Sequence, residues 1–291
     1  MNIIAPSELL INKDGSIFHL HLKPEELADT IILVGDPGRV ELVSSFFDSK
    51  EFIRSSREFI TITGSYKGKR ITVLSTGIGT DNIDIVVNEL DALANIDLKT
   101  RTPKQEHKRL TLLRIGTSGA IQPEIPLGSF VLSHISIGCD GLLNWYKNRD
   151  SVSLLDMEEA FVKHSGWLPQ LPAPYFAQAS QKLIDLMKDF TVKGVTISAS
   201  GFYGPQGRVL RLPLAIPDMV SRFESFNYKG DKITNFEMEG SALAGLSALL
   251  DHDAATVCCI IANRHLHDSQ PEYKQYITQL VELSLERLIK L

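Results

Sequence analysis

The sequence predicts an α/β fold in which one mixed central β-sheet is flanked by helices. Three observations lead to this class. Short β-rich runs end at glycine and small residues, helical patterns follow them, and the alternation continues along the whole chain. With 291 residues, 43% of them hydrophobic, the chain can bury one large core. We therefore expect residues 1–291 to form a single domain.

Five apolar runs are the expected strands, and each stops at glycine or at small polar residues. They cover residues 30–39, 70–80, 110–120, 194–204 and 255–264. In an α/β sheet the loops after the carboxyl ends of the strands line the ligand crevice. The ends of these five runs are therefore where we expect the chemistry.

Four helices are expected from apolar residues at helical spacing. They lie at about 81–95, 176–189, 238–250 and 272–290. Two further stretches read as insertions within the single domain. Residues 96–110 are polar and basic and predict a solvated loop, while residues 164–174 hold three prolines and predict a rigid connector or a rim of the site.

Composition excludes several classes of partner. The formal net charge of -5 leaves no basic field for nucleic acid or for an anionic membrane. Three cysteines, of which Cys258 and Cys259 are adjacent in an apolar run, form neither a disulfide framework nor a metal-binding spacing. The start of the sequence has no targeting pattern, and no apolar run approaches the ~20 residues of a membrane span. We expect a cytoplasmic protein.

The sequence Gly-Asp-Pro-Gly-Arg (35–39) ends the first expected strand. Glycine lets backbone N–H groups approach an anion, and Arg39 can place two donors on phosphate oxygens. The same string also makes a good turn, so both interpretations stay open. The sequence STGIGT (75–80) partly matches the glycine-rich fingerprint of dinucleotide-binding proteins. However, Asn82 occupies the position of the third glycine, and no acidic residue follows at the expected distance. A dinucleotide-dependent oxidoreductase is therefore disfavoured.

Polar side chains also follow the third and fourth expected strands. Arg114 lies near the end of an otherwise apolar run, where it needs an anion or an acid as partner, and Thr117 adds a neutral donor beside it. A structural salt bridge is the alternative for Arg114. In FYGPQGR (202–208), Phe202 can cover a flat ligand, while Gln206 and Arg208 offer donors and an acceptor. This set suits the edge of a pyrimidine, although a polar loop with a packed Phe would look the same.

Two carboxylates stand one residue apart where an apolar helix begins. Glu237 and Glu239 flank Met238, and side chains two apart in an extended strand end share a side. Acids at a helix N-terminus are also favoured by the helix dipole, so helix capping is one explanation. The other is that a carboxylate accepts hydrogen bonds from two adjacent sugar hydroxyls, as in a ribose diol.

Together these segments resemble the nucleoside phosphorylase superfamily of the hexameric type, and within it the branch that acts on uridine. The resemblance runs from about residue 17 to residue 265. It rests on IFHLHL (17–22), GDPGR (35–39), SREF (56–59), STGIG (75–79), LRIGTSGAIQP (113–123), FYGPQGR (202–208), FEMEGS (236–241) and ANR (262–264). Several motifs in the family's order are far more specific than any single one.

The resemblance implies three subsites. Phosphate would be held by Gly35, Arg39, Arg114 and Thr117, together with Arg57 of a neighbouring subunit. Ribose would be bound by Glu239, with Met238 packing on the sugar, Glu237 supporting the strand end and His19 of the neighbouring subunit at the 5′-hydroxyl. The base would meet Phe202, Gln206, Arg208 and Arg264.

The resemblance also implies the reaction. A pentosyltransferase of this kind cleaves uridine, or a related pyrimidine nucleoside, with phosphate, and releases the free base and ribose 1-phosphate in nucleoside salvage. It needs no organic cofactor, and phosphate is its co-substrate. A homodimer unit, usually within a homohexamer, would complete the site, and K⁺ would bind between subunits near Glu58, Ile78 and Asn82.

Two alternatives share the same fold, a purine nucleoside phosphorylase and a nucleosidase. Purine-cleaving relatives favour a Ser-Asp pair at the end of the last expected strand, where this chain has Asn263 and Arg264. Asp268 follows a few residues later, so the preference for a pyrimidine rests on an incomplete argument.

Overall fold

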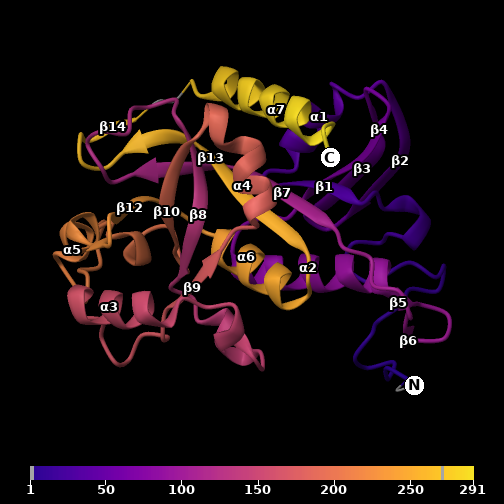
Figure 1. Ribbon diagram of the computed structural model, residues 1–291, viewed down its shortest axis with the longest axis horizontal. Coiled ribbons are helices and arrows are strands. Elements are labelled where there is room, and N and C mark those ends of the chain that lie inside the picture. The colour runs from indigo at the N-terminus through magenta and orange to yellow at the C-terminus, as the bar shows by residue number, and fades with distance from the viewer. Residues whose placement is uncertain (1–2, 270–271) are drawn as a thin grey trace.

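One large β-sheet runs through the molecule, and helices pack against it (Figure 1). The structure is a computed structural model that describes residues 3–269 and 272–291. The strands are β1 Thr30–Val34, β2 Ser49–Ser56, β3 Phe59–Tyr66, β4 Lys69–Ser75, β5 Ile96–Asp97, β6 Thr102–Pro103, β7 Thr111–Ala120, β8 Phe130–Gly138, β9 Tyr175–Gln178, β10 Val192–Ser198, β11 Asn227–Tyr228, β12 Asp231–Glu237, β13 Asp253–Asn263 and β14 Asp268–Ser269. The helices are α1 Gly38–Ser44, α2 Thr80–Asn95, α3 Leu155–Ser165, α4 Gln181–Met187, α5 Met219–Ser225, α6 Gly240–Leu249 and α7 Lys274–Leu288.

The sheet combines parallel and antiparallel strands. β1 lies between β4 and β7 and is parallel to both, and β13 is parallel to β7. β2, β3 and β4 form an antiparallel meander at one edge, and β8 runs antiparallel to β13. The prediction of an α/β fold with a mixed central sheet is confirmed.

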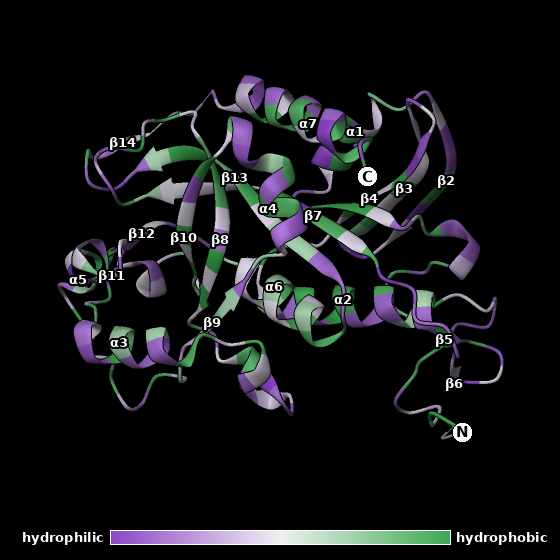
Figure 2. Ribbon diagram, in the orientation of Figure 1, coloured by the Kyte–Doolittle hydropathy of each residue, from purple (hydrophilic) through white to green (hydrophobic). Residues whose placement is uncertain are grey.

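The core lies on both faces of the central strands because their side chains alternate in direction. On β1, Ile31 and Leu33 pack with residues of α2 and α6, whereas Ile32 and Val34 pack with residues of α1, α4 and α7. Figure 2 shows this as hydrophobic residues along the central strands and on the helix surfaces turned toward them. Burial on two faces explains why these strands are nearly all apolar in sequence.

All five expected strands are present, but some boundaries and neighbours differ. The helix expected at 176–189 is wrong in its first part, because residues 175–178 form β9 and pair with β8 before α4 begins at Gln181. Segment 96–110 carries a small antiparallel pair, β5 and β6, in place of a plain loop. Segment 164–174 is a connector after α3, where Trp167 packs on Phe161 with ring centroids 5.6 Å apart.

The fourth expected strand ends earlier than predicted, since β10 stops at Ser198. Residues 199–203 therefore form a loop that carries Phe202 away from the sheet edge. Among the helices of residues 3–269 and 272–291, each is too short or too polar to cross a bilayer.

Candidate active site

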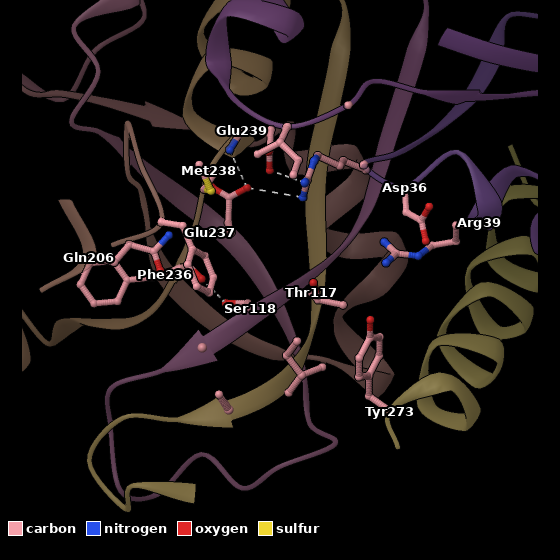
Figure 3. Close-up of a pocket in the computed structure, with 18 of the residues that line it drawn as sticks. Asp36, Arg39, Thr117, Ser118, Gln206, Phe236, Glu237, Met238, Glu239 and Tyr273 are labelled. Carbon is pink, nitrogen blue, oxygen red and sulfur yellow. Dashed lines mark hydrogen bonds and ion pairs between the residues drawn. The ribbon is translucent and has the colours of Figure 1, made fainter. Parts of the chain in front are cut away.

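A cavity of about 840 Å³ lies at the carboxyl ends of the central strands. Its walls come from the segments that follow β1, β4, β10 and β12, from residues of β7 and β13 themselves, and from the turn between β2 and β3, so most of it lies where a ligand crevice is expected in an α/β sheet. The lining residues are Gly35, Asp36, Pro37, Arg39, Glu58, Gly77, Ile78, Asn82, Arg114, Thr117, Ser118, Gly119, Phe202, Gln206, Arg208, Phe236, Glu237, Met238, Glu239, Ile261, Ala262, Ser269 and Tyr273. In Figure 3 the Glu237 to Glu239 segment lies between Gln206 on one side and Arg39 and Thr117 on the other.

The two neighbouring carboxylates have different tasks. Glu237 accepts hydrogen bonds from the backbone N–H groups of Glu239 and Gly240 at 2.9 to 3.0 Å and from the hydroxyl of Ser198. It therefore caps the N-terminus of α6 and joins β12 to β10. With its oxygens occupied in this way, Glu237 fixes the strand-to-helix turn and leaves Glu239 to face the cavity.

Glu239 forms a buried ion pair with Arg114. One oxygen of Glu239 accepts from the backbone N–H of Gly79 at 2.7 Å and the other pairs with the guanidinium, which also lies 3.4 Å from Glu237. Burial raises the pKa of the Glu239 carboxyl, the Arg114 charge opposes this shift, and the Glu237 charge adds to it. Burial also works against the charge of Arg114, but the two carboxylates outweigh it and raise the pKa of that guanidinium.

A second guanidinium completes a positive end of the cavity. Arg39, in α1, donates to the carbonyl of Ile115 at 3.2 Å, and burial together with the charge of Arg114 lowers the pKa of Arg39. Thr117 and Gly35 line the cavity beside them. Two cations held close together in a buried pocket favour an anion between them.

The loop after β10 forms the other end of the cavity. The guanidinium carbon of Arg208 lies 3.8 Å from the centre of the Phe202 ring, and its Nη1 donates to the side-chain carbonyl of Gln206 at 2.6 Å. Gln206 is buried, whereas Phe202 is 51% exposed. An aromatic face, an amide and a guanidinium therefore converge where a flat, polar-edged ligand would fit.

Arg264 has a different role from the base contact that the sequence suggested. It does not line the cavity, and its guanidinium donates to the backbone carbonyls of Gln206 at 2.9 Å and Gly207 at 3.3 Å. Because those carbonyls belong to the loop after β10, Arg264 holds that loop in position.

The sequence profile of the phosphorylase superfamily matches residues 29–291. The chain belongs to this family. It is 30% identical to uridine phosphorylase of Thermococcus kodakarensis over 261 residues. The aligned region covers 87% of this chain and 79% of that protein. Its structure resembles the nucleoside phosphorylase of Trypanosoma brucei, reported to show uridine phosphorylase activity, with a TM-score of 0.87, 29% identity and coverage of 97% of this chain and 100% of that one.

A purine enzyme matches over a shorter stretch. The DeoD-type purine nucleoside phosphorylase of Alkaliphilus metalliredigens is 38% identical over 127 residues, which is 43% of this chain and 48% of that protein. The family resemblance inferred from the motifs is thus confirmed, and so is the nucleoside phosphorylase-like fold class.

His19 and Arg57, the residues that the resemblance assigned to a neighbouring subunit, lie outside the cavity of their own chain. They are linked through Phe18, since the His19 ring packs edge-on against Phe18 at 4.8 Å and the Arg57 guanidinium carbon lies 6.0 Å from the centre of the same ring. Nδ1 of His19 contacts Glu89 at 2.6 Å. The two residues therefore form a surface cluster that a second chain of the phosphorylase could meet.

The positions expected to hold K⁺ lie together on the cavity wall. Glu58, Ile78 and Asn82 all line it, and the side chains of Glu58 and Asn82 both approach Gly77. The Asn82 amide nitrogen donates to the Ile78 carbonyl at 3.5 Å. The carboxylate of Glu58, the carbonyl of Ile78 and the amide oxygen of Asn82 are oxygen ligands of the kind that K⁺ needs, and K⁺ at these positions stays a prediction.

Outside the cavity, Asp91, His107 and His252 bring one ligand atom each within 4.8 Å of one another. The backbone N–H of Leu110 donates to Nδ1 of His252 at 3.2 Å, so the proton of the neutral imidazole lies on Nε2, which contacts Asp91 at 3.1 Å. Nε2 then has no lone pair for a metal. The cluster instead holds segment 96–110 against α2 and the start of β13.

Sequence reasoning missed several lining residues. Ser118, Gly119 and Ile261 sit in or beside motifs that were singled out, so their place at strand ends was a usable signal. Ser269 and Tyr273 come from the segment between β13 and α7, which carries no recognisable pattern. Their place in the cavity is decided by the tertiary structure.

Proposed function

We propose that this phosphorylase cleaves uridine, or a closely related pyrimidine nucleoside, with phosphate to give the free base and ribose 1-phosphate. The observation that carries this proposal is the order of groups along one cavity. Arg39 lies at one end, Glu239 with its partner Arg114 lies in the middle, and Gln206 lies at the other end, where Arg208 joins it to Phe202. A nucleoside and phosphate, laid end to end, present an anion, a sugar diol and a flat base in that order. The named activities of similar proteins support the same reaction.

The chemistry needs groups on both sides of the sugar. A phosphate oxygen forms a bond to the anomeric carbon as the glycosidic bond breaks, and the bonding electron pair leaves with the base nitrogen. The sugar is cation-like in between, so an anion held beside it by Arg39 and Arg114 is stabilising. At the opposite end, donors from Gln206 and Arg208 meet the negative charge that develops on the departing base.

Ligand binding requires an exchange of partners at Arg114. In the structure this guanidinium is paired with Glu239. Phosphate offers Arg114 a second anion, and Glu239 can then turn lone pairs to the ribose hydroxyls while it keeps the N–H of Gly79. Met238 lines the cavity beside Glu239 and would pack on the sugar ring.

The base end supports a pyrimidine rather than a purine. The carboxylates that line the cavity among the described residues are Asp36, Glu58, Glu237 and Glu239, and they belong to the strand ends of the anion and sugar regions. Asp268 is exposed and is not a lining residue, and Asn263 uses its amide to bind the carbonyls of Gln122 and Ile125. No acid is thus placed to protonate a purine ring within the described part of the cavity.

The proposal includes a second copy of the chain, as a homodimer unit within a homohexamer in the cytoplasm. His19 of the partner subunit would meet the 5′-hydroxyl, and Arg57 of the partner subunit would be a third cation at the phosphate. This is tested by mixing Arg39→Ala chains with Arg57→Ala chains. In a mixed dimer, one site keeps its own Arg39 and receives Arg57 from the other chain, so restored activity would support shared sites. Inactive mixed pairs would contradict them. K⁺ at this interface stays a prediction.

The decisive experiment measures base release from uridine and from inosine, each with and without phosphate. Phosphate-dependent release of uracil with little release of hypoxanthine is the expected result. Release that is independent of phosphate would identify a nucleosidase. Preferential cleavage of inosine would identify a purine enzyme, and either outcome would overturn the proposal.

A further inference from the structure

We propose that Tyr273 is an additional phosphate-binding residue, whose phenol hydroxyl donates a hydrogen bond to the bound phosphate. This inference rests on the proposed function for the identity of the anion. It concerns a residue that lies outside all of the motifs by which the family resemblance was drawn, since these end at residue 264.

The position of Tyr273 carries the inference. It lines the same cavity as Gly35, Arg39 and Thr117, although it follows β13 and immediately precedes α7. Figure 3 shows its ring extending into the cavity, with the hydroxyl directed toward the space between Thr117 and Arg39. Tyr273 is also close enough to Arg39 to affect the pKa of that guanidinium, after the larger influences of burial, Arg114 and Asp36.

The backbone of Tyr273 is held firmly, so its hydroxyl has a defined place. Its carbonyl accepts the N–H groups of Tyr276 and Ile277 at 3.1 and 3.2 Å, which starts the 15-residue helix α7. Buried side chains of α7, including Ile277 and Leu280, pack in the core on the same face as α1. A residue fixed to such a helix can orient a hydroxyl without a large loss of freedom.

A phenol suits this subsite chemically. Phosphate has four oxygens, and the proposed cations, Arg39, Arg114 and Arg57 of the partner subunit, already bring positive charge to it. A neutral O–H donor adds a short hydrogen bond to an anion without adding a further positive charge to a buried pocket. Tyr273 would thus contact a phosphate oxygen from the α7 side, where the strand-end loops do not reach.

The test compares Tyr273→Phe with a matched variant, Tyr276→Phe. Tyr276 lies on α7 next to Gly128 and does not line the cavity. Inorganic phosphate alone is titrated into each protein by calorimetry, and the KM values for phosphate and uridine are then measured. Tyr273→Phe should weaken phosphate binding and raise the KM for phosphate by about tenfold, as expected for one hydrogen bond to a charged group. The KM for uridine should change by less than about twofold, and Tyr276→Phe should match the native protein in both measurements.

Each outcome decides the matter. Unchanged phosphate affinity in Tyr273→Phe would overturn the inference, and so would an equal rise in both KM values accompanied by a lower melting temperature, which indicates a structural role. Because the phosphate titration needs no turnover, it tests Tyr273 even if the native protein cleaves no nucleoside. In that case the proposed function fails, while the binding result for Tyr273 still stands or falls by itself.

Discussion

The buried pair of Glu239 and Arg114 leads to the sharpest prediction, made for Glu239→Gln. The substitution keeps the size of the side chain and can keep the hydrogen bond from the Gly79 N–H. It removes the charge that faces Arg114 and sets an amide N–H against a guanidinium N–H. The variant should therefore lose folding stability and should also lose the proposed hydrogen bonds to the two ribose hydroxyls.

Both magnitudes follow from the geometry. Removing one partner of a buried ion pair costs about 3–5 kcal/mol. Here Glu237 stays 3.4 Å from Arg114 and compensates in part, so we expect a loss of about 2–3 kcal/mol in the free energy of unfolding. Losing a hydrogen bond between a charged group and the diol costs about 1.5–3 kcal/mol, which corresponds to a fall in kcat/KM for uridine of roughly 10- to 100-fold.

The assay compares uridine with 2′-deoxyuridine in the native protein and in the variant. The native protein should prefer uridine by roughly 10-fold or more, because 2′-deoxyuridine lacks one of the two hydroxyls. In Glu239→Gln the preference should shrink to within about threefold. Glu158→Gln is a matched control, since Glu158 is a buried acid paired with Arg149 at 2.6 Å outside the cavity. It should lose stability without changing the ratio of the two substrates.

An undiminished preference for uridine in Glu239→Gln would refute the assignment of the diol to this carboxylate. A matched fall in activity for Glu158→Gln would also refute it, because lost stability would then explain the result without any contact to the sugar.

Three further predictions concern the base loop, the sheet edge and a buried acid. Arg208→Ala should raise the KM for uridine at least about tenfold and leave the KM for phosphate within about twofold. The reason is that Arg208 lies beside Phe202, at the end of the cavity away from the proposed phosphate site. Equal changes in both KM values, measured in a two-substrate rate analysis, would contradict this. Gly64→Ala should lower the melting temperature by several degrees. Gly64 lies in β3, and the new methyl carbon would lie 2.1 Å from the carbonyl oxygen of Ser49 in the neighbouring strand β2. An unchanged melting curve would show that the edge strands can separate freely. Burial raises the pKa of the Asp140 carboxyl above its usual 3.8, so the folded protein binds this proton more tightly than the unfolded chain does. The free energy of unfolding should therefore fall as pH rises from 3.8 through the raised pKa. Asp140→Asn should remove this pH dependence, and its stability should rise relative to the native protein between pH 3.8 and the raised pKa, although Asp140 also contacts Tyr175. Urea unfolding midpoints of the two proteins, measured across this pH range, test the prediction. A difference that is constant at every pH would rule it out.

Much of the site was predictable because its residues follow strand ends that are legible in sequence. Glu237, Glu239 and Arg114 all lie at such ends, and apolar strands buried on two faces are easily recognised. The peripheral strands β2 and β3 were not predicted. β2 is largely exposed and contains charged side chains, whereas β3 is mostly buried but mixes apolar residues with threonine, serine and glycine. β9 was taken for helix because its four residues continue directly into α4, and pairing with β8 decided its conformation.

The sequence by itself determined the α/β class, the family resemblance and the set of strand ends at which a ligand would bind. It did not determine which of two adjacent carboxylates faces that ligand, because Glu237 is held by N–H and O–H groups from both β10 and α6. Nor did it determine that Arg264 binds the carbonyls of Gln206 and Gly207, or that Tyr273 lines the same cavity as Arg39. Those outcomes depend on hydrogen bonds and packing between segments far apart in the chain, and local patterns carry no information about such contacts.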